Sequence, residues 1–159
     1  MIIAAYAGTG KTYFASLYPQ KVIDLVCMPY KYIINSNNIF DESSKANIDD
    51  VLNPNWPLNY LLAIKNNLQS DKIILIPPDY FILMLLKSEN MQYYICYPQR
   101  NIKEQYLKRY IDRGNNANFI DIFIGRWDEF IDSYEKDSFG KHIVLQANQF
   151  LSDVIEVLA

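Results

Sequence analysis

The residues in this chain whose types and spacing best fit a chemical task are Gly8-Thr9-Gly10-Lys11-Thr12. Small residues at such a turn let backbone N–H groups curl around a phosphate, and a helix that follows the turn presents its positive end to the anion. The lysine can reach the outer phosphates of a nucleotide, and the final threonine hydroxyl can ligate Mg²⁺. The pattern therefore predicts a phosphate-binding loop for ATP and Mg²⁺. The expected ATP contacts are Ala7, Gly8, Thr9, Gly10, Lys11 and Thr12.

The flanking sequence places this loop between a strand and a helix. The apolar run Ile2–Tyr6 precedes the loop, and the helical pattern Lys11–Leu17 begins within it. The full motif asks for a first glycine where this chain has Ala5, and alanine fits there if the backbone keeps a negative φ, as at a strand end. A glycine-rich turn without a ligand is the alternative, but it leaves Lys11 and Thr12 unexplained.

Length and composition limit the classes of protein that fit. We expect residues 1–159 to form one domain, because half of the residues are hydrophobic and supply an ample core. The net charge of −3 argues against bulk nucleic-acid binding. Cys27 and Cys96 stand in no metal-binding spacing, Met1 leads directly into the first strand, and no apolar run is long enough to span a bilayer. These features predict a reduced, cytoplasmic protein without a membrane partner.

Short apolar runs alternate with amphipathic segments along the chain, which predicts an α/β sandwich around a parallel sheet. The expected strands are Ile2–Tyr6, Val22–Val26, Ile73–Ile76, Tyr93–Tyr97 and Ile143–Leu145. The expected helices are Lys11–Leu17, Leu58–Leu68, Tyr80–Lys87, Ile102–Asp112, Phe119–Glu135 and Asn148–Leu158. Ligands of such sheets bind at the carboxyl ends of the strands, so the loops at that edge are the ones to examine.

Two acidic residues fall at or near that edge. Asp24 interrupts an apolar strand, where a charge is costly unless it is paired or faces a site. It could help Thr12 hold Mg²⁺ or accept a proton from a phosphate acceptor, and a structural ion pair is the alternative. Asp79 follows Pro77 and Pro78, and either assists the metal or caps the next helix.

Residues 98–118 carry the second group of candidate residues. Arg109 and Arg113 are spaced i, i+4 on the expected helix, so they share one face, and an anion between them would relieve their repulsion. Arginine forks bind phosphoryl oxygens in a planar, bidentate way, so we expect both to be catalytic residues on a lid. The alternative is a solvated basic face paired with Glu104 and Asp112. On the next expected helix, Arg126 could reach the phosphates or pair with an acidic neighbour.

The long polar stretch between the second and third expected strands is a candidate acceptor-binding segment, taken as residues 27–57. Structureless loops of that size are uncommon in compact domains unless they bind or cover a ligand. Part of it, Ile48–Leu52, has a helical pattern. With Asp24, the expected acceptor contacts are Tyr30, Lys31 and Tyr60; the tyrosines could stack on a base, or could be half-buried packing residues.

The order of these features resembles the nucleoside monophosphate kinase family, and in particular its compact adenylate-kinase-like members from bacteria and phages. The resemblance is specific at Gly8–Thr12 and at Arg109 with Arg113. It implies a P-loop NTPase fold with a five-stranded parallel sheet in the order 2-3-1-4-5, an acceptor site on 27–57 and a helical lid on 98–118. It also implies that Gln146–Gln149 lies against the donor base.

The resemblance implies ATP- and Mg²⁺-dependent phosphoryl transfer to a nucleoside monophosphate. The chain departs from the family in one respect that bears on the acceptor, because no arginine occurs between residues 25 and 90. Lys31, Lys45, Lys65 or Lys72 would have to replace it, and lysine lacks the bidentate fork. Two alternatives therefore stay open: a kinase for another metabolite or a polynucleotide end, and a regulatory module that binds nucleotide without turnover.

Overall fold

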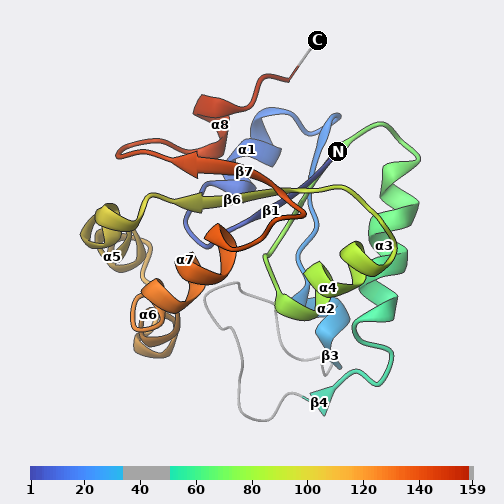
Figure 1. The fold of residues 1–159 in the computed structure, drawn as a ribbon, viewed down its shortest axis with the longest axis horizontal. Helices are drawn as coiled ribbons and strands as arrows, with labels where there is room; N and C mark the ends of the chain where they lie inside the picture. The colour runs from blue at the N-terminus through green and yellow to red at the C-terminus, as the bar shows by residue number, and fades with distance from the viewer. Residues whose placement is uncertain (34–50, 158–159) are drawn as a thin grey trace.

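Helices flank a five-stranded, all-parallel sheet in the computed structural model, which describes residues 1–33 and 51–157 (Figure 1). The predicted α/β class and parallel sheet are confirmed. The strands of this sheet are β1 (Ile2–Ala5), β2 (Val22–Asp24), β5 (Ile73–Ile76), β6 (Tyr94–Pro98) and β7 (Lys141–Leu145). Each lies within about two residues of its expected position, because continuous apolar runs mark strands that are covered on both faces.

The order across the sheet is β2-β5-β1-β6-β7. This order differs from the expected 2-3-1-4-5 when strands are numbered along the described chain. The numbering includes two short strands that the sequence prediction missed, β3 (Tyr32–Ile33) and β4 (Val51–Leu52). These two pair antiparallel with each other, outside the main sheet. The helix expected over Ile48–Leu52 is wrong at its last two residues, which belong to β4. The rest of it, like the acceptor segment from 34 to 50 and its Lys45, lies outside the described residues.

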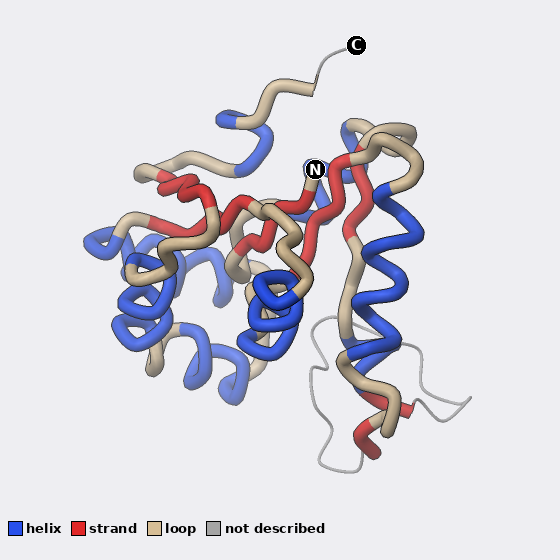
Figure 2. Tube along the Cα trace, turned by 45° about the vertical axis from the view of Figure 1, so that its right-hand side comes forward, coloured by secondary structure: helices blue, strands red, loops and turns tan. Residues whose placement is uncertain are grey.

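The helices lie on both sides of the sheet, an arrangement compatible with a three-layer sandwich. They are α1 (Lys11–Leu17), α2 (Met28–Lys31), α3 (Leu58–Leu68), α4 (Tyr80–Ser88), the 3₁₀ turn η2 (Arg100–Ile102), α5 (Lys103–Asp112), α6 (Ala117–Phe123), α7 (Trp127–Glu135) and α8 (Leu151–Val154). Figure 2 shows α3 running alongside the strands at one edge of the sheet.

Two helix predictions are corrected. The helix expected over Phe119–Glu135 is two helices, α6 and α7, which are separated by a turn at 124–126. A side chain at Gly125 would overlap the carbonyl oxygen of Asp121, so the glycine permits this tight break. The helix expected over Asn148–Leu158 is reduced to α8, because Asn148 has a positive φ of 61° and the chain is extended at Ile155.

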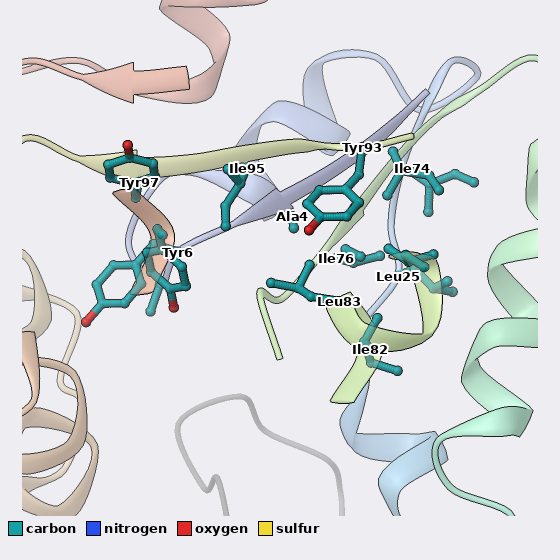
Figure 3. Close-up of a cluster of buried hydrophobic side chains, with 14 of the residues drawn as sticks. Ala4, Tyr6, Leu25, Ile74, Ile76, Ile82, Leu83, Tyr93, Ile95 and Tyr97 are labelled. Atoms are coloured by element: carbon teal, nitrogen blue, oxygen red, sulfur yellow. The ribbon is translucent and has the colours of Figure 1, made fainter. Parts of the chain in front are cut away.

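The buried side chains form a cluster on each face of the sheet. One cluster joins the sheet to α1 and α8 through Phe14 and Leu151. The larger cluster joins the other face to helices α3 to α7, and Figure 3 shows part of it. Alternate residues of each strand point to one face, so Ala4 and Tyr6 enter the larger cluster while Ile3 enters the other.

A buried carboxylate, Asp137, connects α7 to β6 and α4. It accepts hydrogen bonds from the backbone N–H groups of Phe139 (2.9 Å) and Gly140 (3.0 Å) and from the Tyr93 hydroxyl (2.5 Å). The ammonium of Lys87 lies 3.2 Å away. Burial alone would raise the pKa of Asp137, but the hydrogen bonds from Tyr93, Gly140 and Phe139 and the charge of Lys87 outweigh it and lower the pKa. The ionised carboxylate therefore stabilises the folded state.

We expect Asp137→Asn to lower the free energy of unfolding by about 2 kcal/mol near neutral pH, because charge-assisted hydrogen bonds to a buried group are lost. A lowered folded-state pKa contributes stability above the unfolded value and loses it as the pH falls through the folded value. The difference between wild type and variant should therefore shrink below about pH 4. Urea unfolding across this range measures it, with the exposed Asp121→Asn as control. A difference that stays constant down to about pH 2.5 would contradict this role of the charge.

Candidate functional site

The loop between β1 and α1 has the backbone conformation that its glycines predict. Gly8 and Gly10 have φ values of 80° and 87°, a region that L side chains rarely adopt. Thr9 is fully buried, and its hydroxyl donates to the carbonyl oxygen of Tyr6 at 2.7 Å. The loop is therefore a closed turn at the carboxyl end of the central strand of the sheet.

Lys11, the first residue of α1, folds back over this loop. Its ammonium donates to the carbonyl oxygens of Ala5 (2.8 Å) and Tyr6 (3.3 Å). Two backbone carbonyl oxygens thus help to hold the cation at the end of β1. A phosphate in the loop would offer it a charged acceptor, and charge-assisted hydrogen bonds are stronger than neutral ones.

Thr12 and Asp24 meet at the start of α1 and the end of β2. The Thr12 hydroxyl donates to the Asp24 carboxylate at 2.7 Å. Hydroxyl and carboxylate oxygens are hard ligands of the kind that Mg²⁺ prefers. Among the residues that the structure describes, no three His, Cys, Asp or Glu side chains gather as a metal site. The pair alone fits a Mg²⁺ ion that takes its other ligands from water and substrate phosphates.

Helix α5 packs directly on the loop. The Tyr110 hydroxyl donates to the Ala7 carbonyl oxygen at 2.9 Å, and the rings of Tyr106 and Tyr110 are fully buried. A Cβ at Gly8 would lie 2.9 Å from the Tyr110 ring, so the helix and the loop are in close contact. Burial raises the pKa of Tyr110 far above its usual value and keeps the hydroxyl protonated as a donor.

Arg109 fastens the same helix to the loop and to the segment after β7. Its guanidinium donates to the carbonyl oxygens of Gly8 (3.0 Å) and Gln149 (3.2 Å). It lies between two aromatic rings, with its central carbon 4.0 Å from the ring centre of Phe150 and 4.5 Å from that of Tyr106. Arg109 is therefore held on several sides in this structure.

Arg113 follows the last turn of α5, where Gly114 ends the helix with a φ of 75°. Its side chain is exposed and lines a pocket of about 520 Å³ over the loop. Arg109 also lines this pocket, so the two arginines border it together. The further lining residues are Ala7, Gly8, Gly10, Lys11, Thr12, Tyr13, Asp112, Phe119 and Phe150. Asp112, the expected partner of a solvated basic face, pairs with Lys108 at 2.7 Å.

The other end of the expected lid is tied to α7. The Arg100 guanidinium contacts the carboxylates of Asp128 (3.2 Å), Asp132 (2.5 Å) and Glu135 (2.9 Å). The carbonyl oxygen of Arg100 also accepts a hydrogen bond from the indole of Trp127 at 3.1 Å. These contacts tie η2, and with it the start of α5, to α7.

The residues expected to bind an acceptor lie near one another, but their side chains are engaged within the protein. Tyr60 is fully buried, and its hydroxyl donates to the Leu25 carbonyl oxygen, so its ring belongs to the core. Tyr30 packs edge-on against Tyr60 at 5.3 Å and is half-buried. The Lys31 ammonium lies 3.7 Å from the Asp79 carboxylate. Asp79 also caps α4 through the N–H groups at 81 and 82, as the capping alternative predicts.

Several residues of the site were not singled out from the sequence. Tyr106 and Tyr110 are spaced i, i+4, a spacing that indicates one helix face and could have marked the buried side of α5. Phe150, which stacks on Arg109, carries no local signal, because its contact depends on how β7 ends. Tyr6 packs against Trp127, Phe130 and Tyr134 of α7, a contact that the sequence does not encode locally.

Comparison with models of protein families and with curated proteins finds no match for this chain. Within residues 1–33 and 51–157, no helix has the length and hydropathy needed to cross a membrane.

Proposed function

We propose that this chain is a P-loop kinase that uses ATP and Mg²⁺ to phosphorylate a nucleoside monophosphate or a similar small acceptor. The observation that carries the proposal is the arrangement around the loop at 7–12. An ammonium, a hydroxyl and two arginines line one pocket at the carboxyl edge of a parallel sheet, and the hydroxyl, that of Thr12, donates to the Asp24 carboxylate. Ligands of open α/β sheets bind at this edge. In this proposal the fold is that of P-loop NTPases, with α5 as its helical lid.

The donor phosphates would lie over the loop. Backbone N–H groups of residues 7–12 would bind the β-phosphate, and Lys11 would exchange the carbonyl oxygens of Ala5 and Tyr6 for a γ-phosphate oxygen. Thr12 and Asp24 would hold Mg²⁺, which when bound neutralises phosphate charge. Since Thr12 already donates to Asp24, the two oxygens need little rearrangement to share one cation.

The two arginines of α5 have different tasks in this proposal. Arg109, held by the carbonyl oxygens of Gly8 and Gln149, would position the loop and the phosphates on it. Arg113, exposed at the pocket rim, would bind the transferring phosphoryl group, where charge develops in the transition state. Small movements of the end of α5 would exclude water and so limit hydrolysis of ATP.

The identity of the acceptor decides between the proposed function and its alternatives. No arginine lies between residues 25 and 90, and Lys31, the expected substitute, pairs with Asp79. This observation favours, as second candidates, a kinase for another metabolite or a polynucleotide end, or a nucleotide-binding regulatory module.

An acceptor panel tests the proposal. Wild-type protein with ATP and Mg²⁺ is expected to phosphorylate at least one common ribo- or deoxyribonucleoside monophosphate at millimolar concentration, measured by nucleotide chromatography. ATP binding measured by calorimetry, with no transfer to any monophosphate, would support the regulatory module or another acceptor. Absence of ATP binding would overturn both the kinase and the module.

A further inference from the structure

A second pocket, of about 340 Å³, lies between α4 and α7, and we call it the α4–α7 groove. Its volume is in the range of pockets that bind small molecules. It is lined by Pro78, Tyr80, Leu83, Met84 and Lys87 on the α4 side and by Arg126, Glu129, Phe130, Ser133, Tyr134 and Asp137 on the α7 side. The helices run below the sheet in Figure 1.

The α4–α7 groove is connected to the phosphate loop through an aromatic wall. The rings of Phe130 and Tyr134 are parallel within 8°, with their centres 6.3 Å apart. Both rings also pack against Tyr6 of the loop, at 5.8 and 5.9 Å. Tyr6 therefore links this wall to the end of β1, where the phosphate loop begins.

Tyr134 contributes a polar group to this wall. Its side chain is mostly buried and lines the groove. A tyrosine hydroxyl can both donate to and accept from a polar group of a bound molecule. The Tyr93 and Tyr110 hydroxyls, by contrast, already donate to Asp137 and to the Ala7 carbonyl oxygen.

The two cations of the groove differ in how they are held. Lys87 pairs with the buried Asp137, near the ends of α4 and α7. Arg126 precedes α7 and is exposed, and its guanidinium lies 4.8 Å above Phe130. It makes a two-pronged pair with Glu129 at 3.0 and 2.5 Å. Solvent screening weakens exposed pairs of this kind, so Arg126 can readily exchange Glu129 for another anion.

Arg126 lies at the end of the groove that is nearer the carboxyl edge of the sheet. Because Lys87 meets Asp137 at the far ends of the two helices, their first residues, with Tyr80 and Arg126, mark the other end of the groove. That end follows the carboxyl terminus of β5 through Pro78. The carboxyl edge of the sheet is also where the phosphate loop lies.

We propose that the α4–α7 groove is the acceptor site, and that it binds a nucleoside monophosphate with its phosphate on Arg126 and its base on the Phe130 wall. The Tyr134 hydroxyl would hydrogen-bond the sugar or base. This inference rests on the proposed function for its role in transfer, but binding to the groove does not require ATP. It also accounts for the missing arginine at 25–90, because the fork that recognises phosphate comes from Arg126 before α7.

Binding without ATP tests the groove directly. The probes are AMP, GMP, CMP, UMP and dTMP, each titrated by calorimetry or by saturation-transfer NMR up to millimolar concentration. We expect at least one to bind, and Arg126→Gln to weaken its binding about tenfold or more, as loss of a charge-assisted pair does. The matched control is Glu129→Gln, which breaks the same ion pair but leaves the arginine, so it should bind the probe as tightly or more tightly. The corresponding nucleoside, which has no phosphate, should bind both variants equally.

Each other outcome overturns the groove as the acceptor site. It is overturned if none of the five monophosphates binds, if Arg126→Gln binds like wild type, or if Arg126→Gln and Glu129→Gln lose affinity equally. It is also overturned if Lys31→Ala abolishes binding and Arg126→Gln does not, since the acceptor would then lie on 27–57. Parallel titrations with ATP separate this inference from the proposed function. If wild type does not bind ATP, the proposed kinase function is wrong. Monophosphate binding that depends on Arg126 would still support the groove as a binding site.

Discussion

Lys11→Ala is expected to lower turnover by about 10²-fold or more and ATP affinity by about tenfold. The ammonium lies at the end of β1, where it contacts the carbonyl oxygens of Ala5 and Tyr6. With alanine those carbonyl oxygens remain, but the positive charge that Lys11 would bring to the γ-phosphate is lost. The loss in turnover exceeds the loss in affinity because phosphoryl charge is redistributed in the transition state.

Calorimetry with ATP and single-turnover kinetics measure the two effects separately. Lys65→Ala is the matched control, because Lys65 lies on α3 and pairs with Glu89 on the surface. This control also removes one positive charge, but at a distance from the loop in sequence and structure, so it should behave like wild type. If Lys11→Ala binds ATP as tightly as wild type, the phosphate-binding assignment of Gly8–Thr12 is wrong.

The parts of the fold that were predicted correctly are those encoded by local patterns. The bounds of α1 and α3 match the expected Lys11–Leu17 and Leu58–Leu68, because each has an uninterrupted helical pattern with a clear start. The break between α6 and α7 was missed because the apolar pattern of the expected helix Phe119–Glu135 continues across Gly125. Only the tight backbone at Gly125 reveals the turn. The ribbon of β3 and β4 was missed because it pairs residues on either side of a long polar segment.

The candidate site shows the same division. The loop glycines and the contact of Thr12 with Asp24 follow from a motif and from the rule that strand ends meet at one edge. The burial of Tyr60 could not be predicted, because a tyrosine near a binding segment has the same sequence signature whether it packs in the core or stacks on a base. The contacts that surround Arg109 could not be predicted either, because Phe150 and Gly8 come from distant parts of the chain.

We expect Arg113→Ala and Arg109→Ala to differ in ATP affinity and melting temperature, although the sequence alone gives both arginines the same role. Arg113 is exposed at the pocket rim, so its alanine variant should lose about 10²-fold in turnover, with ATP affinity changed by less than about threefold. Arg109 is bonded to two carbonyl oxygens and lies between two rings. Its alanine variant should therefore lose ATP affinity and melting temperature as well as turnover, because the loop is no longer fastened to α5.

The conservative variants decide what each arginine contributes. Arg113→Lys keeps the charge but not the fork, so it should recover only part of the turnover if bidentate contact with the phosphoryl group matters. Arg109→Lys should recover little of the melting temperature, because a lysine cannot bond two carbonyl oxygens and fill the space between Tyr106 and Phe150 in the same way. Thermal unfolding, ATP calorimetry and turnover are measured on all four variants. Equal losses of ATP affinity at both positions would mean that both arginines hold the bound nucleotide, and an Arg113→Ala variant with wild-type turnover would make that arginine a solvated surface residue.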